Sequence, residues 1–423
     1  MSKRHILLAN VFYAPFTYGG ATIVAEELAK ALVARGDCRV TAVSLCTRAE
    51  LKTYTVVKSE RDGIVNYVIN VPEHRSYHEM YNNPHVTALL GELMDGLRPD
   101  LVHAHCIQDM GSGVLEAAKA RNIPTILSIH DFWWICERQF MIRPDGRYCG
   151  QSPVSIDACR GCVGDMGAAR ARFDHLQRMG ALADCVTYPS QFAHDLVTAS
   201  GFAPLRGVVL ENGVRLPDPG FADKQRARRA ADPRLTFGFV GGPSHIKGWP
   251  LIRSAFRNMQ QDDFQVLLVD GSNDGSWWTP LDIEGLPGDW RIHPRFDQVD
   301  MDDFYAQIDV LLFMSQWKET FGLAIREALA RGVKVIQTDS GGTVEHVAAK
   351  SADLIPIDAS PSILQAQISE ALDRHPTPTT PVPVTSYADQ AAEFHQIVEY
   401  ALAIPARRTP GSRSHSDGRV QRR

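Results

Sequence analysis

The chain has 423 residues, a formal net charge of -5 at pH 7, 44% hydrophobic residues and 22% charged residues. Its length predicts two domains, because single cores rarely grow beyond about 250–300 residues. The composition is that of a soluble globular protein, and no dominant basic stripe favours nucleic acid as a partner. No apolar run reaches the roughly 18–20 residues of a membrane-spanning helix, which excludes that class of protein.

The amino-terminal stretch MSKRHILLANVFYAPF has a basic tip and a short apolar run but lacks a small-residue cleavage site. It therefore predicts a first strand and not a signal peptide. Eight cysteines without a secretory signal indicate a reducing compartment. We expect a cytoplasmic protein.

Short β-branched runs alternate with helical patterns through the first half of the chain. The stretch TIVAEELAKALVARG carries its apolar residues on one helical face and ends at Gly36. Such alternation predicts a parallel sheet covered by helices. The expected strands are HILLANV (5–11), RVTAVSL (39–45), LVHAHC (101–106), TILSIHD (125–131) and CVTYPS (185–190).

The same pattern restarts after a basic helical stretch. Its strands are expected at LTFGFVG (235–241), FQVLLVDG (264–271), VLLFM (310–314) and VKVIQT (333–338). The sequence thus predicts an α/β chain of two Rossmann-like, doubly wound parallel-sheet domains that face each other across a cleft. The expected division is an N-terminal domain (1–205) with a Cys-rich insertion (132–168), an interdomain linker (206–234), a C-terminal domain (235–385), a C-terminal helix (386–403) that returns to the N-terminal domain, and a disordered basic tail (404–423).

The tail sequence PARRTPGSRSHSDGRVQRR has six arginines, one aspartate and no apolar periodicity. Disorder is the favoured interpretation. The alternative is weak attraction to an anionic membrane surface, which would hold the protein at the inner face of the cell membrane.

Two carboxylates frame a predicted helix in the stretch QWKETFGLAIREALARGVKVI. Gly322 lets the backbone turn into this helix, and the free amides at Leu323 and its neighbours attract a phosphate. Glu319 precedes the helix, and Glu327 is expected one turn inside it, facing the same cavity. Each carboxylate can accept two hydrogen bonds from a vicinal diol. A nucleotide diphosphate sugar would satisfy the whole arrangement, whereas exposed, salt-bridged glutamates are the alternative.

Seven further motifs agree with this interpretation in order and spacing. They are GG (19–20), VHAH (102–105), HD (130–131), PSQF (189–192), ENGV (211–214), FVGGPSHIKGW (239–249), and ETFGLAIREALARG followed by TDSGGTVEHV. With them, nearly all of residues 5–403 resembles the retaining glycosyltransferase family 4, which has the two-domain GT-B fold. Members of this family build bacterial polysaccharides, glycolipids and sucrose. The resemblance implies an acceptor-side N-terminal domain and a nucleotide-sugar-binding C-terminal domain.

The resemblance also implies roles for individual residues. Glu319 would contact the sugar ring of the donor, and Glu327 would hold its ribose. Lys247 would pair with the diphosphate, and His130 would lie near the transferred sugar. The remaining residues expected at the donor are Gly20, Gly241, Phe321, Gly322 and Leu323.

One position departs from the family pattern. The family often has Gly-Arg where this chain has Gly241-Gly242, so an arginine that normally assists Lys247 is missing. Neither Arg326 nor His245 can be assigned this role from the sequence. The loss of a cation either weakens stabilisation of the leaving group or implies compensation from elsewhere.

These residues together predict transfer of a sugar from a GDP- or UDP-linked donor to a hydroxyl of a glycan or lipid-linked glycan, with retained configuration. The leaving phosphate would take the acceptor proton, so no enzymic nucleophile and no divalent metal are expected. One alternative is a sugar-nucleotide epimerase with the same fold. Another is a transferase-shaped binding protein that has lost activity through the Gly242 change.

The insertion carries Cys136, Cys149, Cys159 and Cys162 within 27 consecutive residues. Four thiolates could hold a structural Zn²⁺ in a segment that has little core of its own. The alternative is a set of free thiols, or a redox pair formed by Cys159 and Cys162.

Aromatic residues gather in the first loop and at the start of the insertion. Stacking on an acceptor sugar, or contact with a lipid carrier, is the functional interpretation, and core packing is the alternative. The candidates are Tyr13, Phe16, Tyr18, Trp133 and Trp134. His103 and His105 share one face of a strand and are expected to be structural, hydrogen-bonded residues.

Overall fold

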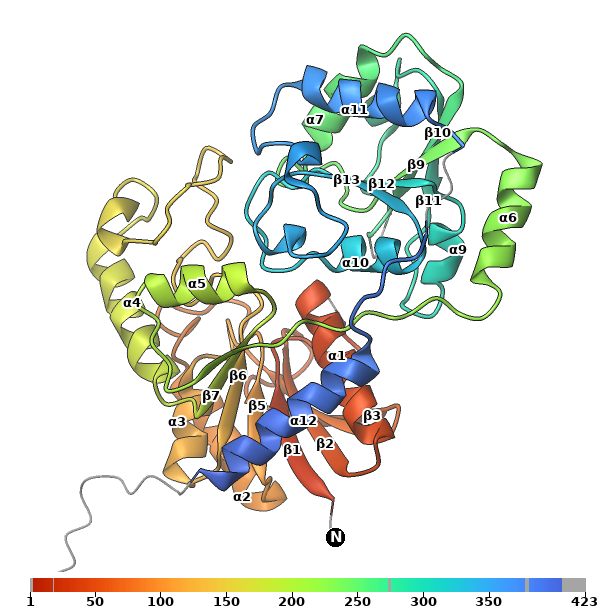
Figure 1. The fold of residues 1–423 in the computed structure, drawn as a ribbon. Helices are drawn as coiled ribbons and strands as arrows, with labels where there is room; N and C mark the ends of the chain where they lie inside the picture. Colours follow the sequence, from red (N-terminus) through yellow and green to blue (C-terminus); the bar gives the residue numbers. More distant parts are fainter. Residues whose placement is uncertain (1–2, 18, 273–274, 377–379, 405–423) are drawn as a thin grey trace, which may run out of the picture.

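The structure is a computed structural model, and it describes residues 3–17, 19–272, 275–376 and 380–404. Its strands form two separate sheets, one in each half of the chain, with helices on their faces (Figure 1). The predicted α/β fold with two parallel-sheet domains is therefore confirmed. The predicted basic tail lies outside the described residues except for Ile404, and so does Tyr18.

The first sheet has eight strands in the order β3-β4-β2-β1-β5-β6-β7-β8. All pairs are parallel except β3 with β4, which form a hairpin. All five expected strands form, and four of them (β1, β5, β6 and β7) end two or three residues earlier than expected, which leaves the residues after them free to form loops. The bounds are β1 (Arg4–Ala9), β2 (Cys38–Cys46), β3 (Val56–Arg61), β4 (Ile64–Asn70), β5 (Leu101–Ala104), β6 (Thr125–Ser128), β7 (Cys185–Tyr188) and β8 (Gly207–Val209).

Both faces of this sheet are covered. Alternate residues of β1 belong to different cores, Leu7 on one face and Ile6 and Leu8 on the other, as the two-residue period of a strand requires. The helix at the end of the chain packs against α1 and contributes Phe394 to the second of these cores. The helices of this half are α1 (Gly20–Ala34), α2 (Pro84–Leu97), α3 (Gly113–Ala120), α4 (Met166–Gly180), α5 (Gln191–Ala199) and the returning α12 (Tyr387–Ala403).

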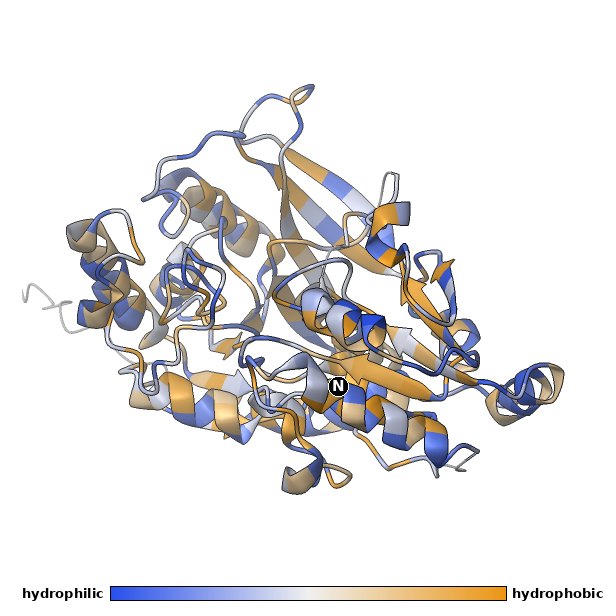
Figure 2. Ribbon diagram, turned by 90° about the horizontal axis from the view of Figure 1, so that it is seen from above, coloured by the Kyte–Doolittle hydropathy of each residue, from blue (hydrophilic) through white to orange (hydrophobic). Residues whose placement is uncertain are grey.

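The second sheet is fully parallel and has the order β11-β10-β9-β12-β13. Its central strands β9, β10 and β12 are apolar and buried, whereas the helices around it carry one apolar and one polar face (Figure 2). The strands are β9 (Leu235–Phe239), β10 (Phe264–Val269), β11 (Asp289–His293), β12 (Val310–Phe313) and β13 (Lys334–Gln337). The helices are α6 (Phe221–Ala231), α7 (Trp249–Arg257), α8 (Pro280–Ile283), α9 (Met301–Tyr305), α10 (Leu323–Ala330) and α11 (Pro361–Asp373).

The segment expected to be an interdomain linker, 206–234, contains two regular elements. Strand β8 lies at the edge of the first sheet, where it pairs with β7. Helix α6 joins the second half, because Arg228 and Arg229 both form ion pairs with Asp309, which follows α9. The chain therefore crosses between the two sheets within 210–220.

The insertion lies between β6 and α4 and is irregular apart from a 3-10 turn at Ile156–Cys159 (Figure 1). It extends toward the second half of the protein: a Cβ built on Gly146 would lie 4.0 Å from the Nδ1 atom of His245. Arg147 and His245 also line one shared pocket of about 520 Å³. The insertion therefore contacts the loop that carries Lys247.

Candidate active site

The amino end of α10 lies between the two sheets and is open. Gly322 precedes it with φ 87°, a left-handed conformation that glycine adopts without strain, and no side chain of the described residues caps this end. Gly20, at the start of α1 in the other half, lies directly opposite: a Cβ on Gly20 would be 3.2 Å from Cδ1 of Leu323. Figure 1 shows α1 and α10 facing each other across the gap between the halves. The free amides of α10 are thus presented to this interface.

Lys247 meets Glu319 in the loop that leads into this helix end. Lys247 Nζ donates to Glu319 Oε1 at 2.8 Å, and the Ser315 hydroxyl donates to the same oxygen. The backbone of Glu319 is fixed as well, since its amide donates to the Ser340 carbonyl and its carbonyl accepts from Gly342. The structure therefore brings together a cation and a carboxylate from segments 72 residues apart in the chain.

The conformation of the loop that carries Lys247 depends on two glycines, Gly241 and Gly248. A Cβ on Gly241 would lie 2.9 Å from Cβ of Lys247, and a Cβ on Gly248 would lie 2.1 Å from the carbonyl oxygen of Met314. Close packing of this kind excludes any larger residue. It fixes Lys247 beside the end of β12, where Met314 lies.

Gly242 occupies the position at which the family often has arginine, and the structure gives the reason. Its φ is 64°, and a Cβ there would lie 2.6 Å from the indole of Trp277. A Cβ on Gly271 would meet the same indole at 2.5 Å. Trp277 is 43% exposed, and its amide donates to Asp270. The indole therefore fills the space that an arginine at this position would need.

Arg326 does not replace the missing cation. Its guanidinium is buried and donates to the carbonyls of Phe321, Thr343, Gly342 and Glu345. It therefore joins the loop before α10 to the loop after β13. His245 lies apart from these contacts, in the pocket shared with the insertion.

Glu327 is buried one turn inside α10. Its Oε2 accepts from the hydroxyl of Tyr305 at 2.9 Å. Burial raises the pKa of the Glu327 carboxyl above its usual 4.5, although the Tyr305 hydrogen bond and the Arg331 charge oppose the shift. The sequence predicts that Glu327 faces the same cavity as Glu319. In the structure its side chain is 7% exposed and is hydrogen-bonded to the Tyr305 hydroxyl, so it is buried and already has a partner.

His130 lies at the end of a chain of imidazoles. Its Nε2 is 2.9 Å from His105 Nδ1, and His105 Nε2 is 3.2 Å from His103 Nδ1. His103 Nε2 is in turn 2.8 Å from the hydroxyl of Ser128. Burial lowers the pKa of His130 to about 4 and that of His103 to about 3, so these rings are neutral at pH 7. Because a neutral ring has one N–H and one lone pair, the tautomer of His130 is coupled to those of the other two.

Three further side chains join the halves of the protein at this point. The Thr320 hydroxyl donates to the carbonyl of His130 at 2.7 Å, and the Ser190 hydroxyl donates to the carbonyl of Thr320 at 2.6 Å. The Glu345 carboxylate accepts from the amides of Gln191 and Phe192 at the start of α5. These residues lie in the family motifs of the sequence, but no contact between them was predicted, since no spacing relates one half of the chain to the other.

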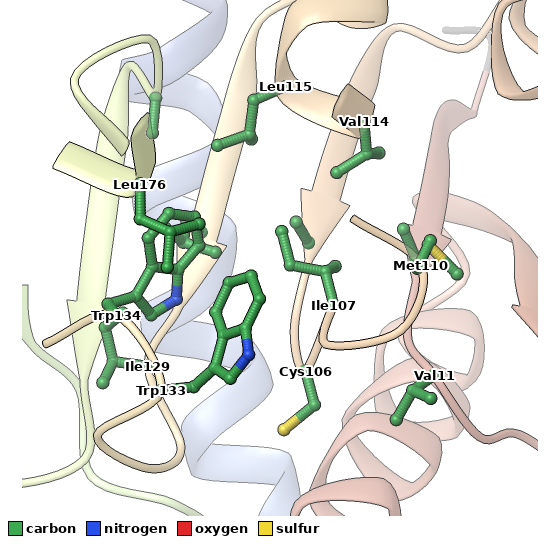
Figure 3. Packing of buried hydrophobic residues seen from close by; sticks show 14 of the residues in the cluster. Val11, Cys106, Ile107, Met110, Val114, Leu115, Ile129, Trp133, Trp134 and Leu176 are labelled. Carbon is green, nitrogen blue, oxygen red and sulfur yellow. The ribbon is translucent and has the colours of Figure 1, made fainter. Parts of the chain in front are cut away.

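The aromatic candidates divide into buried and accessible residues. Tyr13 and Trp134 are each 3% exposed within the cores, and Figure 3 shows Trp134 next to Leu176. They have no free face for stacking on a sugar, so the prediction that they contact the acceptor is corrected to core packing. Phe16 is 38% exposed beneath Arg48. Trp133 is 7% exposed and belongs to the same core as Trp134, although it also lines a pocket.

The four cysteines of the insertion line one cavity of about 430 Å³. All are free thiols. Cys162 donates its amide to the carbonyl of Cys159, and Gly161 between them has φ 84°, so the Cys-x-x-Cys segment is a tight turn. Within the described part of the chain, three candidate ligand atoms lie within 4.8 Å of one another only at Asp37, Cys38 and His395. Burial raises the pKa of the Cys38 thiol to about 11, and it raises that of the Cys136 thiol in the insertion to about 11 as well, so the thiol pKa does not distinguish these two places.

Comparison with known proteins agrees with this geometry. Residues 18–217 match the family model described as Glycosyltransferase Family 4, and residues 221–380 match Glycosyl transferases group 1. Two facing Rossmann-like sheets with an open helix end between them define the GT-B class of glycosyltransferases. The chain belongs to glycosyltransferase family 4 within that class.

Known proteins resemble the chain over most of its length. An uncharacterized 42.6 kDa protein from the cps region of Klebsiella pneumoniae is 22% identical over 361 residues, 81% of this chain and 87% of the relative. A D-inositol 3-phosphate glycosyltransferase from Salinispora arenicola is 24% identical over 322 residues, 70% and 71% of the two chains.

Solved structures share the fold at low sequence identity. Sucrose-phosphate synthase from Thermosynechococcus elongatus has a TM-score of 0.60 at 17% identity, covering 95% of this chain and 96% of that one. HepE from Anabaena, solved with UDP and glucose, has a TM-score of 0.58 at 16% identity, covering 94% and 95%. In the described residues, no helix combines the length and apolarity that crossing a membrane requires.

We predict that Glu327→Gln raises the free energy of unfolding by about 1–2 kcal/mol at pH 8, on the scale of a buried polar group. The native carboxyl holds its proton to higher pH than the unfolded one, so its contribution to stability is present below the usual pKa of 4.5 and is lost as pH rises through the raised value. Urea unfolding at pH 5 and pH 8 measures this. The gain should be larger at pH 8, and Glu393→Gln at an exposed site of α12 should change little. An equal gain at both pH values would contradict the buried-carboxylate account.

We predict that Gly242→Arg destabilises the protein by about 1–3 kcal/mol, because the side chain meets Trp277 and the backbone is left-handed. Gly63→Arg is the matched control: φ is 73°, and a Cβ there meets nothing within 4 Å. Thermal unfolding should show a larger loss for Gly242→Arg than for the control, and adding Trp277→Ala should recover the difference. Equal losses would mean that the indole does not occupy this space.

Proposed function

We propose that the protein is a retaining glycosyltransferase that moves a sugar from a GDP- or UDP-linked donor to a hydroxyl of a glycan or lipid-linked glycan. The observation that carries the proposal is the contact between Lys247 and Glu319 in the loop that leads into the uncapped end of α10. Gly20 and His130 approach this point from the other half. The complexes of HepE with UDP and with UDP-glucose support a nucleotide-sugar donor.

The diphosphate would take the place of Glu319 as the partner of Lys247. The amides of α10 and the ammonium group of Lys247 both stabilise negative charge, and that charge grows on the leaving phosphate as the bond to the sugar breaks. Glu319, released from Lys247, would accept hydrogen bonds from hydroxyl groups of the sugar. Positioning and electrostatic stabilisation are therefore the contributions of the protein, and the mechanism needs no divalent metal.

In the transfer itself, every bond broken or formed and the proton that moves belong to the donor or the acceptor. The bond from the anomeric carbon to the phosphate oxygen breaks, and the acceptor oxygen forms its bond on the same face of the sugar. The acceptor proton passes to the departing phosphate oxygen. His130 acts here as a neutral hydrogen-bonding group on the sugar, because the pKa of about 4 leaves it uncharged at pH 7.

Two other functions make different demands on the site. An epimerase needs an acid and a base on either side of the sugar, and the groups gathered here are a carboxylate paired with lysine and an imidazole within a hydrogen-bonded chain. A binding protein needs only the donor contacts. Incubation with UDP- and GDP-sugars separates the three: a transferase releases nucleotide diphosphate when acceptor is present, an epimerase isomerises the sugar without release, and a binding protein does neither.

We predict that Lys247→Ala lowers kcat by about 10²–10³-fold, as expected for removal of one preorganised charge at the leaving group. Glu319→Gln should lower kcat more than it weakens nucleotide binding. Lys318→Ala is the matched control, because this neighbouring lysine is paired with Asp339. Kinetics with the donor identified above test this. Activity of Lys247→Ala equal to that of the control would exclude the proposed role.

We also propose a structural Zn²⁺ in the insertion, held by Cys136, Cys149, Cys159 and Cys162. The support is their convergence on one cavity and the tight turn at Cys159–Cys162. The sulfur atoms would have to approach one another as the ion binds. Free thiols remain the alternative.

Elemental analysis of the purified protein should give about one zinc per chain. Cys159→Ser should abolish it, whereas Cys46→Ser, in β2 outside the insertion, should retain it. Zinc below stoichiometry that does not depend on Cys159 would contradict the site.

A further inference from the structure

A second pocket, of about 350 Å³, opens in the N-terminal half beside the start of the insertion. Such a volume is at the lower end of the range for small-molecule sites, about 300–1,000 Å³. Its lining includes Tyr77, Tyr81, Trp133, Glu137 and Arg172. We call it the Arg172 pocket. None of these residues takes part in the donor contacts at α10.

The unusual feature of the pocket is the state of its arginine. Arg172, in α4, is 4% exposed, and its guanidinium lies 5.0 Å from the ring centre of Trp133. Its hydrogen bond runs from Nη2 to the carbonyl of Trp133 at 2.7 Å. Among the described residues, Arg172 forms no ion pair within 4.0 Å, and its Nε and Nη1 atoms make no hydrogen bond, although the charges of Glu137 and Asp131 act on it from a greater distance.

A buried cation without a counter-ion is costly, and native proteins normally supply a partner. The buried Arg331 of this chain follows that rule, since it is paired with Asp302. Burial lowers the pKa of Arg172, which reflects the same cost. The Nε and Nη1 atoms of Arg172 therefore lack an acceptor, and a bound anion could provide one.

The acidic residue of the pocket, Glu137, attracts Arg172 by its charge but makes no hydrogen bond to it. Glu137 Oε2 accepts from the Tyr77 hydroxyl at 2.6 Å and makes no ion pair among the described residues. Arg138 also lines the pocket, so its charged residues sum to one positive charge. That balance is complementary to a ligand with a single negative charge.

The walls of the pocket fit a sugar ring. Tyr77 is 38% exposed and provides aromatic surface, and such surface packs against the apolar face of a ring while hydroxyl groups bond to polar neighbours. Tyr81 and Trp133 also line the pocket but are only 6% and 7% exposed. The position fits as well, since Trp133 is three residues after His130 and the segment of Tyr77 and Tyr81 follows β4. Both lie beyond the carboxyl ends of strands of the first sheet, where open α/β sheets bind ligands.

We propose that the Arg172 pocket binds a sugar ring that carries one anionic group, a carboxylate or a phosphate ester, and that this ring belongs to the acceptor. Arg172 Nε and Nη1 donate charge-assisted hydrogen bonds to the anion, and the aromatic walls hold the ring. The acceptor role rests on the proposed function, whereas the binding site does not.

Saturation-transfer NMR with three probes, in the presence of saturating UDP, tests the site directly. The probes are glucuronic acid, glucose 6-phosphate and unmodified glucose, and UDP keeps the phosphate probe away from α10. At least one anionic probe should bind at least tenfold more tightly than glucose. The anion preferred in this comparison identifies the carboxylate or the phosphate ester as the natural group. Equal binding of all three probes, or binding of none, would overturn the proposal.

Variants then locate the binding. Arg172→Gln should weaken binding of the anionic probe by about ten- to a hundredfold, as for loss of a charged hydrogen-bond partner. Arg170→Gln is the matched control on the same helix, because Arg170 is exposed and paired with Asp157. If Arg172→Gln fails to fold, Met80→Glu at the exposed rim should repel the anion while Met80→Gln does not. Binding unchanged in Arg172→Gln, or in Met80→Glu, would overturn the assignment.

UDP binding, measured in parallel by calorimetry, distinguishes the two proposals. It should be the same in the parent and in Arg172→Gln, because the two sites share no residue. A parent protein that binds the anionic sugar but no nucleotide would refute the proposed function and support the pocket.

Discussion

The open amino end of α10 is the constraint on which the rest of the site depends. A helix leaves its first amides without backbone partners, and in this chain no described side chain caps them. The surrounding sequence keeps that end accessible: Gly322 provides the left-handed turn, Gly20 leaves space opposite Leu323, and Gly241 lets Lys247 approach. A larger side chain at any of these positions would close the space where the halves meet.

The buried polar network explains how two halves with separate cores present one site. Thr320 joins the loop before α10 to the loop of His130, and Arg326 joins it to the loop after β13. Each carbonyl and hydroxyl in this network has a partner, which gives the loops one arrangement. The groups that lack partners in their surroundings are therefore informative. Two of them, among the described residues, are the amides of α10 on the donor side and the Nε and Nη1 atoms of Arg172 on the other.

Much of the fold could be predicted from the sequence because central strands are apolar and short. The strands β3, β4, β8 and β11 were missed. Strands β3, β8 and β11 are edge strands with exposed residues and therefore little hydrophobic signal, whereas β4 is an interior strand in which the buried Asn66 and Asn70 interrupt the apolar pattern. Sequence spacing can place residues together only where they are neighbours in the chain. Glu319, Gly322 and Leu323 are such neighbours, at and just before the start of α10. Partners from distant segments, such as Tyr305 for Glu327 and Trp277 for Gly242, depend on tertiary packing, which no spacing encodes.

The central claim is that the end of α10 and Lys247 together hold the diphosphate of the donor. The most direct measurement is a crystal structure of the protein with bound UDP or GDP. We predict phosphate oxygens about 3 Å from the amide of Leu323 and from Nζ of Lys247, with the Lys247–Glu319 contact broken. A nucleotide bound with its phosphates away from α10, and Lys247 still paired with Glu319, would contradict the account.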